Sequence, residues 1–305
     1  TSQYTLSLHD ALPIWIIDGH LAPPAPHLAG AMDIPFVHTV GGRWVAHYPP
    51  LWPALLAAGM AAGAWWLVSP LLGAAVVVLV ALVGAELFGR RAGVLAAAFA
   101  ALSPLGRLLA STAMSHTAAT LLLLAGLWLL LRSRGRDQLR WSAGSGLAIG
   151  LLAGMRPLTG AAAGFVLLLA LVVLDRRRRG RTAGAWLSGG AVGLLPSLLA
   201  NLVVHGHPLR SGYALAGAPM AAPDQIPFGI RNLDVILVHA AASVHGWGWE
   251  LVGGGVMLAL ALGLAALPFL SRRCGRNEML LAGLLAAVAV AHIFTRAHGL
   301  HGYGA

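Results

Sequence analysis

Arg156 is the residue whose type and position point most directly to chemistry. It follows an apolar run and precedes a proline, in Met155-Arg156-Pro157. About 14 residues separate it from Arg140, roughly 21–24 Å of helix, so its guanidinium should lie below the far surface of a membrane core about 30 Å thick. An arginine at that depth usually faces a bundle interior or a water-filled cavity, and its fork of donors suits a phosphate or pyrophosphate. Snorkelling to lipid headgroups and a structural pairing are the alternatives.

Three further residues have types that suit a polar ligand. His116 follows Ser115 at the predicted start of a helix, where Ser115 is expected to cap the free amides while His116 faces headgroups or a site outside the membrane. Tyr48-Pro49-Pro50 is a stiff segment, because proline fixes its own backbone and restrains its predecessor. This segment either only shapes a loop or forms a crevice wall, with the Tyr48 hydroxyl and the Arg43 guanidinium directed at a sugar or phosphate.

Histidines gather on one predicted side of the chain. Twelve of the 13 fall in long polar segments or at the ends of apolar runs on that side. Either histidine is simply tolerated there, or the imidazoles form a site for a phosphate or a divalent ion. No His-Glu-x-x-His, phosphate-cradling glycine loop or Gly-x-Ser-x-Gly elbow occurs in the sequence, so no metal ligand is assigned. A carboxylate base on that side is expected either from sequence that the fragment has lost or from the few acids present there: Asp18, Asp33, Asp224, Asp234 and Glu250.

Long apolar runs must position these residues. The 305-residue chain is 58% hydrophobic and 10% charged, with a mean hydropathy of +0.78, whereas soluble domains are about 25% charged. Runs of about 20 apolar residues predict membrane-spanning helices, so we expect an all-α, polytopic transmembrane helix bundle of about eight spans. The predicted spans are 70–88, 92–110, 114–131, 142–158, 159–174, 183–204, 251–270 and 279–295.

Arginine supplies all 20 basic residues against ten acids, a formal charge of +10. The arginines stand in short clusters between apolar runs, without the aromatic-interleaved basic face that tracks a phosphate backbone, so a nucleic-acid partner is excluded. Sorted by alternate sides of the spans, fourteen fall on one side and six on the other. The richer side is predicted to be cytoplasmic by the positive-inside rule. Its clusters are Arg90–Arg91, Arg132–Arg140, Arg176–Arg181 and Arg272–Arg276.

The apolar segment Trp52–Val68 could be a ninth span. A crossing there would invert every later loop and place the arginine-poor loops in the cytoplasm. We therefore expect an interfacial helix or a re-entrant pair of half-helices, with Trp52 at one end and Trp65 and Trp66 at the other as aromatic anchors. The long polar segments 15–51 and 205–250 then both lie outside.

The two ends of the chain differ from its middle. Residues 1–14 resemble translated sequencing-adaptor read-through rather than a signal peptide, and they are set aside from the fold. Residues 15–51 are expected to be the remnant of a first external loop, and residues 52–305 a transmembrane domain containing the external loop 205–250 and truncated at its C-terminus. The single Cys274 allows no disulfide framework.

Several short motifs, in order along the chain, resemble the polytopic membrane glycosyltransferases of the GT-C fold. That broad group includes dolichyl-phosphate-mannose protein mannosyltransferases and aminoarabinose transferases. Each motif is weak alone, but their order and spacing make the set moderately specific. They are Gly19–Pro26, Gly42-Arg43-Trp44, Tyr48-Pro49-Pro50, Leu102-Ser103-Pro104, Met114-Ser115-His116, Met155–Thr159, Gly206–Leu209, His298-Gly299 and Tyr303-Gly304.

The resemblance implies an integral protein of the bacterial plasma (inner) membrane that takes a sugar from a polyprenyl-phosphate-linked donor. Transfer to a lipid, protein or glycan hydroxyl is expected at the external face, with inversion at the anomeric carbon. In the family an external acid is the base, while arginines and in some members a divalent ion neutralise the leaving lipid phosphate. The expected substrate-binding residues are Arg156, His116, Tyr48, Arg43 and Asp33.

The sequence departs from the family upstream of Gly19, where the acidic motif normally lies. No catalytic acid is therefore assigned, Asp18 and Asp33 are weak substitutes, and the chain as it stands is expected to be an inactive fragment. A transporter or lipid flippase is the alternative, because such proteins also use broken helices and buried arginine, and it predicts internal repeats. A non-catalytic membrane scaffold is a further alternative, in which Arg156 has no role in sugar transfer.

Overall fold

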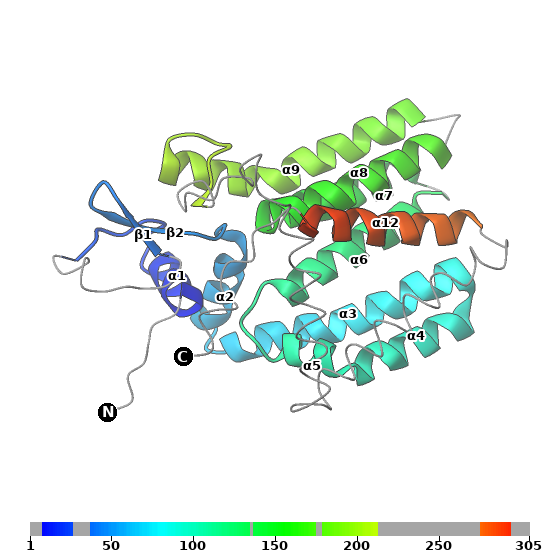
Figure 1. Ribbon diagram of the computed structural model, residues 1–305, viewed down its shortest axis with the longest axis horizontal. Helices are drawn as coiled ribbons and strands as arrows, with labels where there is room; N and C mark the ends of the chain where they lie inside the picture. Colours follow the sequence, from blue (N-terminus) through cyan, green and yellow to red (C-terminus); the bar gives the residue numbers. More distant parts are fainter. Residues whose placement is uncertain (1–7, 27–36, 135–136, 175–178, 213–274, 294–305) are drawn as a thin grey trace. The chain divides into compact units, whose positions relative to one another are not determined.

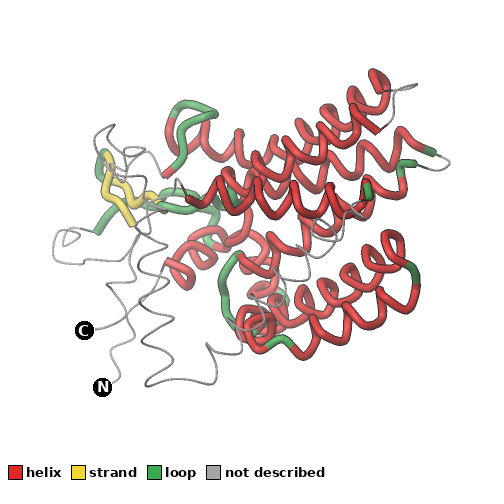
Figure 2. The backbone as a smooth tube through the Cα atoms, turned by 45° about the vertical axis from the view of Figure 1, so that its right-hand side comes forward, coloured by secondary structure: helices red, strands yellow, loops and turns green. Residues whose placement is uncertain are grey.

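A computed structural model of the protein describes residues 8–26, 37–134, 137–174, 179–212 and 275–293 (Figure 1). The chain divides into two compact units, which are described separately. The first comprises Thr1–Gly160 and Leu171–Gly217, and the second Ala161–Ala170 and Ala218–Ala305. Helices make up most of the described residues, and the strands among them form one short hairpin (Figure 2).

The first unit begins with a helix and the hairpin. Helix α1 (Leu8–Ile17) precedes strands β1 (Val37–Val40) and β2 (Arg43–Ala46), which pair antiparallel. The two-residue turn is Gly41-Gly42, where φ is 56° and 73°, the left-handed geometry that a tight hairpin turn requires of both residues. Leu12 is 1% exposed and packs with Ala46. The predicted boundary at residue 14 therefore falls inside α1.

The segment Trp52–Val68 is divided between two helices. Helix α2 (Leu51–Ala61) ends before Gly63, whose φ is 67°, and Trp65 begins α3 (Trp65–Phe88), so of the two expected arrangements a single interfacial helix is not formed. At about 1.5 Å per residue α2 spans only about 16 Å, too short to cross a bilayer.

The predicted span 92–110 is also two helices, α4 (Arg90–Leu102) and α5 (Pro104–Ala110). Proline disfavours a helical backbone in the residue before it, and Ser103 is extended, with ψ 118°. The Ser103 hydroxyl accepts from the Gly106 amide at 3.2 Å and caps α5.

The remaining helices of the first unit lie close to their predicted intervals. They are α6 (His116–Arg132), α7 (Gln138–Met155) and α9 (Arg179–His205). Helix α8 (Pro157–Leu174) begins and ends in the first unit, while its residues 161–170 belong to the second. The second unit also contains α12 (Arg276–Ile293), where a Cβ placed on Gly283 would lie 3.7 Å from the Val166 side chain of α8. The buried apolar residues of the two helices are Ala163, Leu167, Leu280 and Leu284. The predicted span 251–270 and most of the loop 205–250 lie outside the described residues.

Two described helices, Trp65–Phe88 and Gly180–His205, are long and apolar enough to cross a membrane, and three shorter ones are also apolar. The expectation of an all-α membrane helix bundle is thereby confirmed, because helices dominate the described chain and expose many large apolar side chains.

Helix directions within the first unit bring several arginine clusters to one end. Gly73 near the start of α3 lies beside Thr117 near the start of α6, so these helices run parallel. Trp128 of α6 packs edge-on against Trp141 of α7 at 6.2 Å, so α7 runs back. The Ser142 hydroxyl donates to the Thr182 carbonyl, which sets α9 parallel to α7. The arginines that follow α3, end α6 and begin α7 and α9 therefore share one end of this unit.

Candidate functional site at the helix α7–α8 junction

Arg156 stands at the break between two helices. Helix α7 ends at Met155, and Arg156 adopts φ −137° and ψ 85°, outside the helical region. Pro157 then begins α8, where its missing N–H costs no hydrogen bond. The Arg156 amide donates to the Leu152 carbonyl at 2.7 Å, and its carbonyl accepts from Gly160 at 2.9 Å. The backbone amide and carbonyl of Arg156 therefore keep their hydrogen bonds, although the residue itself is not helical.

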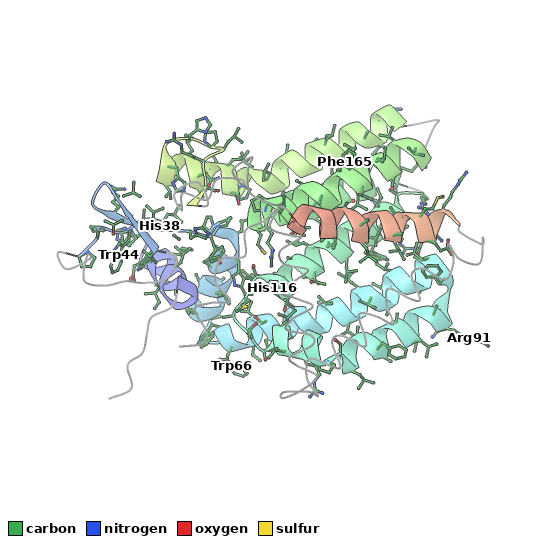
Figure 3. All side chains as sticks on the ribbon, in the orientation of Figure 1. His38, Trp44, Trp66, Arg91, His116 and Phe165 are labelled. Atoms are coloured by element: carbon green, nitrogen blue, oxygen red, sulfur yellow. The ribbon has the colours of Figure 1, made fainter. Side chains whose placement is uncertain are left out.

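The structure brings Arg156 and His116 together. The Arg156 Nη1 lies 2.6 Å from Nδ1 of His116, and both side chains are half-buried. A guanidinium only donates hydrogen bonds, so Nδ1 must accept and the imidazole proton must sit on Nε2. The pair thus carries one positive charge on two planar groups at the end of the unit opposite the arginine clusters. Figure 3 shows His116 and Arg91 far apart along the helices.

Trp52 contacts the chain segments that carry both Arg156 and His116, a role that was not predicted from the sequence. It is 3% exposed and forms a buried cluster with Leu56, Ala118 and Met155. Its indole Nε1 donates to the Ala113 carbonyl at 2.8 Å, which fixes the segment that leads into α6. The prediction of an interfacial anchor is therefore wrong for Trp52. Trp65 and Trp66, 44% and 62% exposed, have the exposure expected of such anchors.

The start of α6 differs from its prediction in one respect. Ser115 occupies the N-cap position, but its side chain makes no capping hydrogen bond. A serine cap requires an extended backbone, whereas Ser115 has φ −69° and ψ −1°. Thr117 instead donates to the Leu109 carbonyl at 3.0 Å and ties the start of α6 to α5.

Glycines fix α7 against α9 and so position Arg156. A Cβ placed on Gly146 or Gly150 would collide with the backbone of Trp186 or Gly190. The Ser197 hydroxyl donates to the Gly154 carbonyl at 2.7 Å, two residues before Arg156. Small residues are expected where membrane helices approach closely, and here they hold the end of α7 in place.

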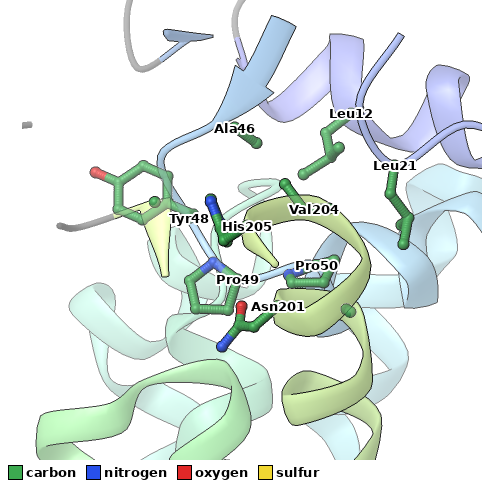
Figure 4. Close-up of a pocket in the computed structure, with 11 residues that line it drawn as sticks. Leu12, Leu21, Ala46, Tyr48, Pro49, Pro50, Asn201, Val204 and His205 are labelled. Atoms are coloured by element: carbon green, nitrogen blue, oxygen red, sulfur yellow. The ribbon is translucent and has the colours of Figure 1, made fainter. Parts of the chain in front are cut away.

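Within the described ranges, Tyr48 lies beside a small cavity. Its ring meets His47 edge-on at 4.9 Å, and Nδ1 of the buried His47 lies 3.3 Å from Nε2 of His38. The cavity has a volume of about 20 Å³, enough for about one water molecule. Figure 4 shows Tyr48, Pro49, Pro50, Asn201 and His205 around it.

The other predicted site residues are not joined to the Arg156–His116 pair by any described contact. Arg43 is exposed on β2 beside the hairpin turn, and Asp33 lies outside the described residues. No group of three or more His, Cys, Asp or Glu side chains converges within the described ranges.

Comparison with known proteins adds one finding. The family model described as dolichyl-phosphate-mannose-protein mannosyltransferase matches residues 48–200. The matched segment begins at Tyr48 and contains Trp52, His116 and Arg156. No curated protein and no solved structure gives a significant match. Since the matched residues cover half of the chain and contain the half-buried Arg156 and its partner His116, the chain belongs to the dolichyl-phosphate-mannose-protein mannosyltransferase family of membrane glycosyltransferases.

Proposed function

We propose that the protein transfers a sugar from a polyprenyl-phosphate-linked donor to an acceptor hydroxyl at the external face of a bacterial plasma membrane. The observation that supports this most directly is the Arg156–His116 contact of 2.6 Å at a helix break. It lies inside the segment that matches the family model. The pair is assigned to the donor phosphate, and the acceptor is a lipid, protein or glycan.

The proposed role of Arg156 follows from where charge develops. As the bond between the anomeric carbon and the phosphate oxygen breaks, negative charge grows on the leaving polyprenyl phosphate. Fixed donors in a site shielded from water stabilise such charge strongly. Arg156 has five N–H donors, of which one bonds His116, so the others are oriented by that bond toward an incoming phosphate.

The rest of the reaction requires a base. The acceptor hydroxyl loses its proton to a carboxylate, its oxygen attacks the anomeric carbon from the opposite face, and the sugar is transferred with inversion. Asp33, Tyr48 and Arg43 are proposed as further contacts to the donor. Segment 15–51 is proposed to be external, ahead of a transmembrane domain over 52–305 whose loop 205–250 faces the same side.

Donor retention by purified protein tests the proposal without requiring turnover. The Arg156→Gln and His116→Gln variants are incubated with a radiolabelled polyprenyl-phosphate mannose, the sugar named in the family description. Losing a charge-assisted hydrogen bond of about 1.5–3 kcal/mol should weaken retention by Arg156→Gln about 10- to 150-fold. A smaller loss is expected for His116→Gln, which keeps the guanidinium.

Arg210→Gln is the control, because Arg210 is an exposed arginine in the loop after α9, away from the half-buried Arg156. It should retain the donor as the unaltered chain does. Equal retention by Arg156→Gln and the unaltered chain would overturn the proposal. Arg156→Lys distinguishes the effect of the positive charge from that of the planar guanidinium. Partial retention of the donor is expected, because an ammonium keeps the charge but lacks the fork of N–H donors.

A further inference from the structure

A second and larger cavity lies among helices α3, α4, α5 and α6 of the first unit. It is an open groove with a volume of about 430 Å³, within the range of about 300–1,000 Å³ usual for small-molecule sites. Small side chains line much of it and leave the space open. These are Gly73, Ala74, Ala100, Ala101, Gly106 and Ala110.

The walls of the groove present hydrocarbon rather than free donors. Ser111, Thr117 and Thr120 border it, but their hydroxyls donate to the carbonyls of Leu108, Leu109 and His116 at 2.8, 3.0 and 2.9 Å. A hydroxyl already bonded to the backbone has little to offer a polar ligand. The groove therefore suits an apolar chain.

The surroundings of the groove indicate that this chain comes from the bilayer. The helices that form it expose large apolar side chains, among them Leu71 on α3 and Phe99 and Leu102 on α4, each more than 60% exposed. Pro70 to Val77, the α3 residues of the groove, lie about 8–18 Å along the helix from Trp65 at about 1.5 Å per residue. Exposed tryptophans mark the membrane interface, so the groove lies within one leaflet.

Among the described residues that line the groove, Arg107 is the one that carries a charge. It is exposed in the last turn of α5, and among the residues that the structure describes no carboxylate pairs with it. A long basic side chain near a helix end reaches the headgroup layer while its stem stays in apolar surroundings. The groove thus pairs an apolar slot within a leaflet with one cation at the level of the headgroups.

We propose that the groove binds one acyl chain of an anionic glycerophospholipid, with the phosphate of its headgroup at Arg107. The site involves neither Arg156 nor His116, so it stands independently of the enzymatic proposal. Its ligand is a membrane lipid that remains bound, rather than a substrate that is turned over.

Native mass spectrometry of the full 305-residue chain in detergent tests this, with phosphatidylglycerol and phosphatidylcholine of identical acyl chains as the probes. The unaltered chain should bind one phosphatidylglycerol in preference to phosphatidylcholine. Arg107→Gln should reduce the preference about fivefold, the effect of one basic residue near a headgroup layer. Ala101→Leu should reduce binding of both lipids, because its longer side chain fills the groove.

Two matched variants complete the design. Arg210→Gln removes an arginine outside the groove, and Ala98→Leu adds the same bulk to α4 at an exposed position that does not line it. Both should bind as the unaltered chain does. Equal binding of the two lipids by the unaltered chain, or unchanged binding by Arg107→Gln and Ala101→Leu, would overturn the proposal. So would loss of phosphatidylglycerol in Arg156→Gln, which would place the lipid at the donor site.

Discussion

Both the apolar ring and the polar N–H of the Trp52 indole make contacts. The ring packs on Leu56, Ala118 and Met155, and the indole nitrogen donates to the Ala113 carbonyl at 2.8 Å. Met155 adjoins Arg156 in the chain, and Ala113 lies three residues before His116, so one side chain braces both partners of the proposed phosphate site. A residue that contacts neither donor nor acceptor can therefore control how the pair is placed.

Replacing Trp52 by phenylalanine removes the hydrogen bond while keeping most of the ring. The Ala113 carbonyl then loses its donor, and the free energy of unfolding should fall by about 1–3 kcal/mol. Thermal unfolding in detergent measures this, and donor retention should fall in parallel because His116 loses its support. Trp66→Phe, at a position 62% exposed, should change neither. An unaltered melting temperature for Trp52→Phe would contradict this role for the indole.

Two site residues could be recognised from sequence, but their contact could not. Arg156 was identifiable because a guanidinium between apolar runs is costly, and His116 because it begins a helix. Forty positions separate them, and no local pattern reports a pairing over that distance. Trp52 was misjudged because tryptophan beside prolines at the edge of an apolar run also marks a membrane interface.

At the scale of elements, the contact between α7 and α9 depends on glycines, which have no side chain to separate the two backbones. Glycines at positions 146, 150, 189 and 193 allow backbone to meet backbone, and a Cβ at any of them would collide with a carbonyl of the other helix. Such close packing replaces the hydrophobic driving force that is lost between helices in lipid.

Gly150→Ala tests this contact. The added methyl meets the Gly190 carbonyl, and overpacking of this kind costs about 1–3 kcal/mol. The melting temperature in detergent should fall. Gly184→Ala on α9 is the control, since nothing lies within 4 Å of its Cβ position, and its stability should be unchanged or slightly higher because alanine favours helix. Equal melting temperatures for the two variants would show that the contact is looser than described.

The helices themselves were largely predictable, because runs of apolar residues fixed where α3, α6, α7, α8 and α9 lie. Their interruptions were harder to foresee. The break before Pro104 follows from the restriction that proline imposes on Ser103, yet an unbroken apolar run obscured it. The turn at Gly63 was missed for the same reason. Hydropathy is averaged over many residues, so it does not report that one glycine adopts a left-handed backbone conformation. Helix α1 was not foreseen, because residues 1–14 were set aside.

For the molecule as a whole, the first unit has two chemically different ends. One collects arginines and aromatic rings: Arg132 lies 5.6 Å from the Trp128 ring centre and Arg140 lies 4.9 Å from that of Trp141. The other carries the Arg156–His116 pair. This arrangement agrees with the assignment of most arginines to one side of the predicted spans. By the positive-inside rule, the arginine-rich end is predicted to face the cytoplasm.

Cysteine labelling in cells checks this orientation, helped by the single Cys274. In a Cys274→Ser background, Thr39→Cys on the exposed hairpin should react with a membrane-impermeant maleimide added to intact spheroplasts. Arg91→Cys, in the cluster after α3, should react only after the membrane is opened. Labelling of both from the same side would contradict a unit that spans the bilayer, and the reverse pattern would contradict the predicted orientation.

The glycine contact between α7 and α9 also bears on how the protein can move. No side chain stands between the two backbones at the contact, so no rotamer change can let one helix slide past the other. Arg156 therefore follows a helix whose backbone is fixed against α9, and His116 begins a helix whose start is held by the hydrogen bonds of Thr117 to Leu109 and of Trp52 to Ala113. We therefore expect the proposed donor to be admitted by changes in the side chains around the pair rather than by a shift of α7 against α9.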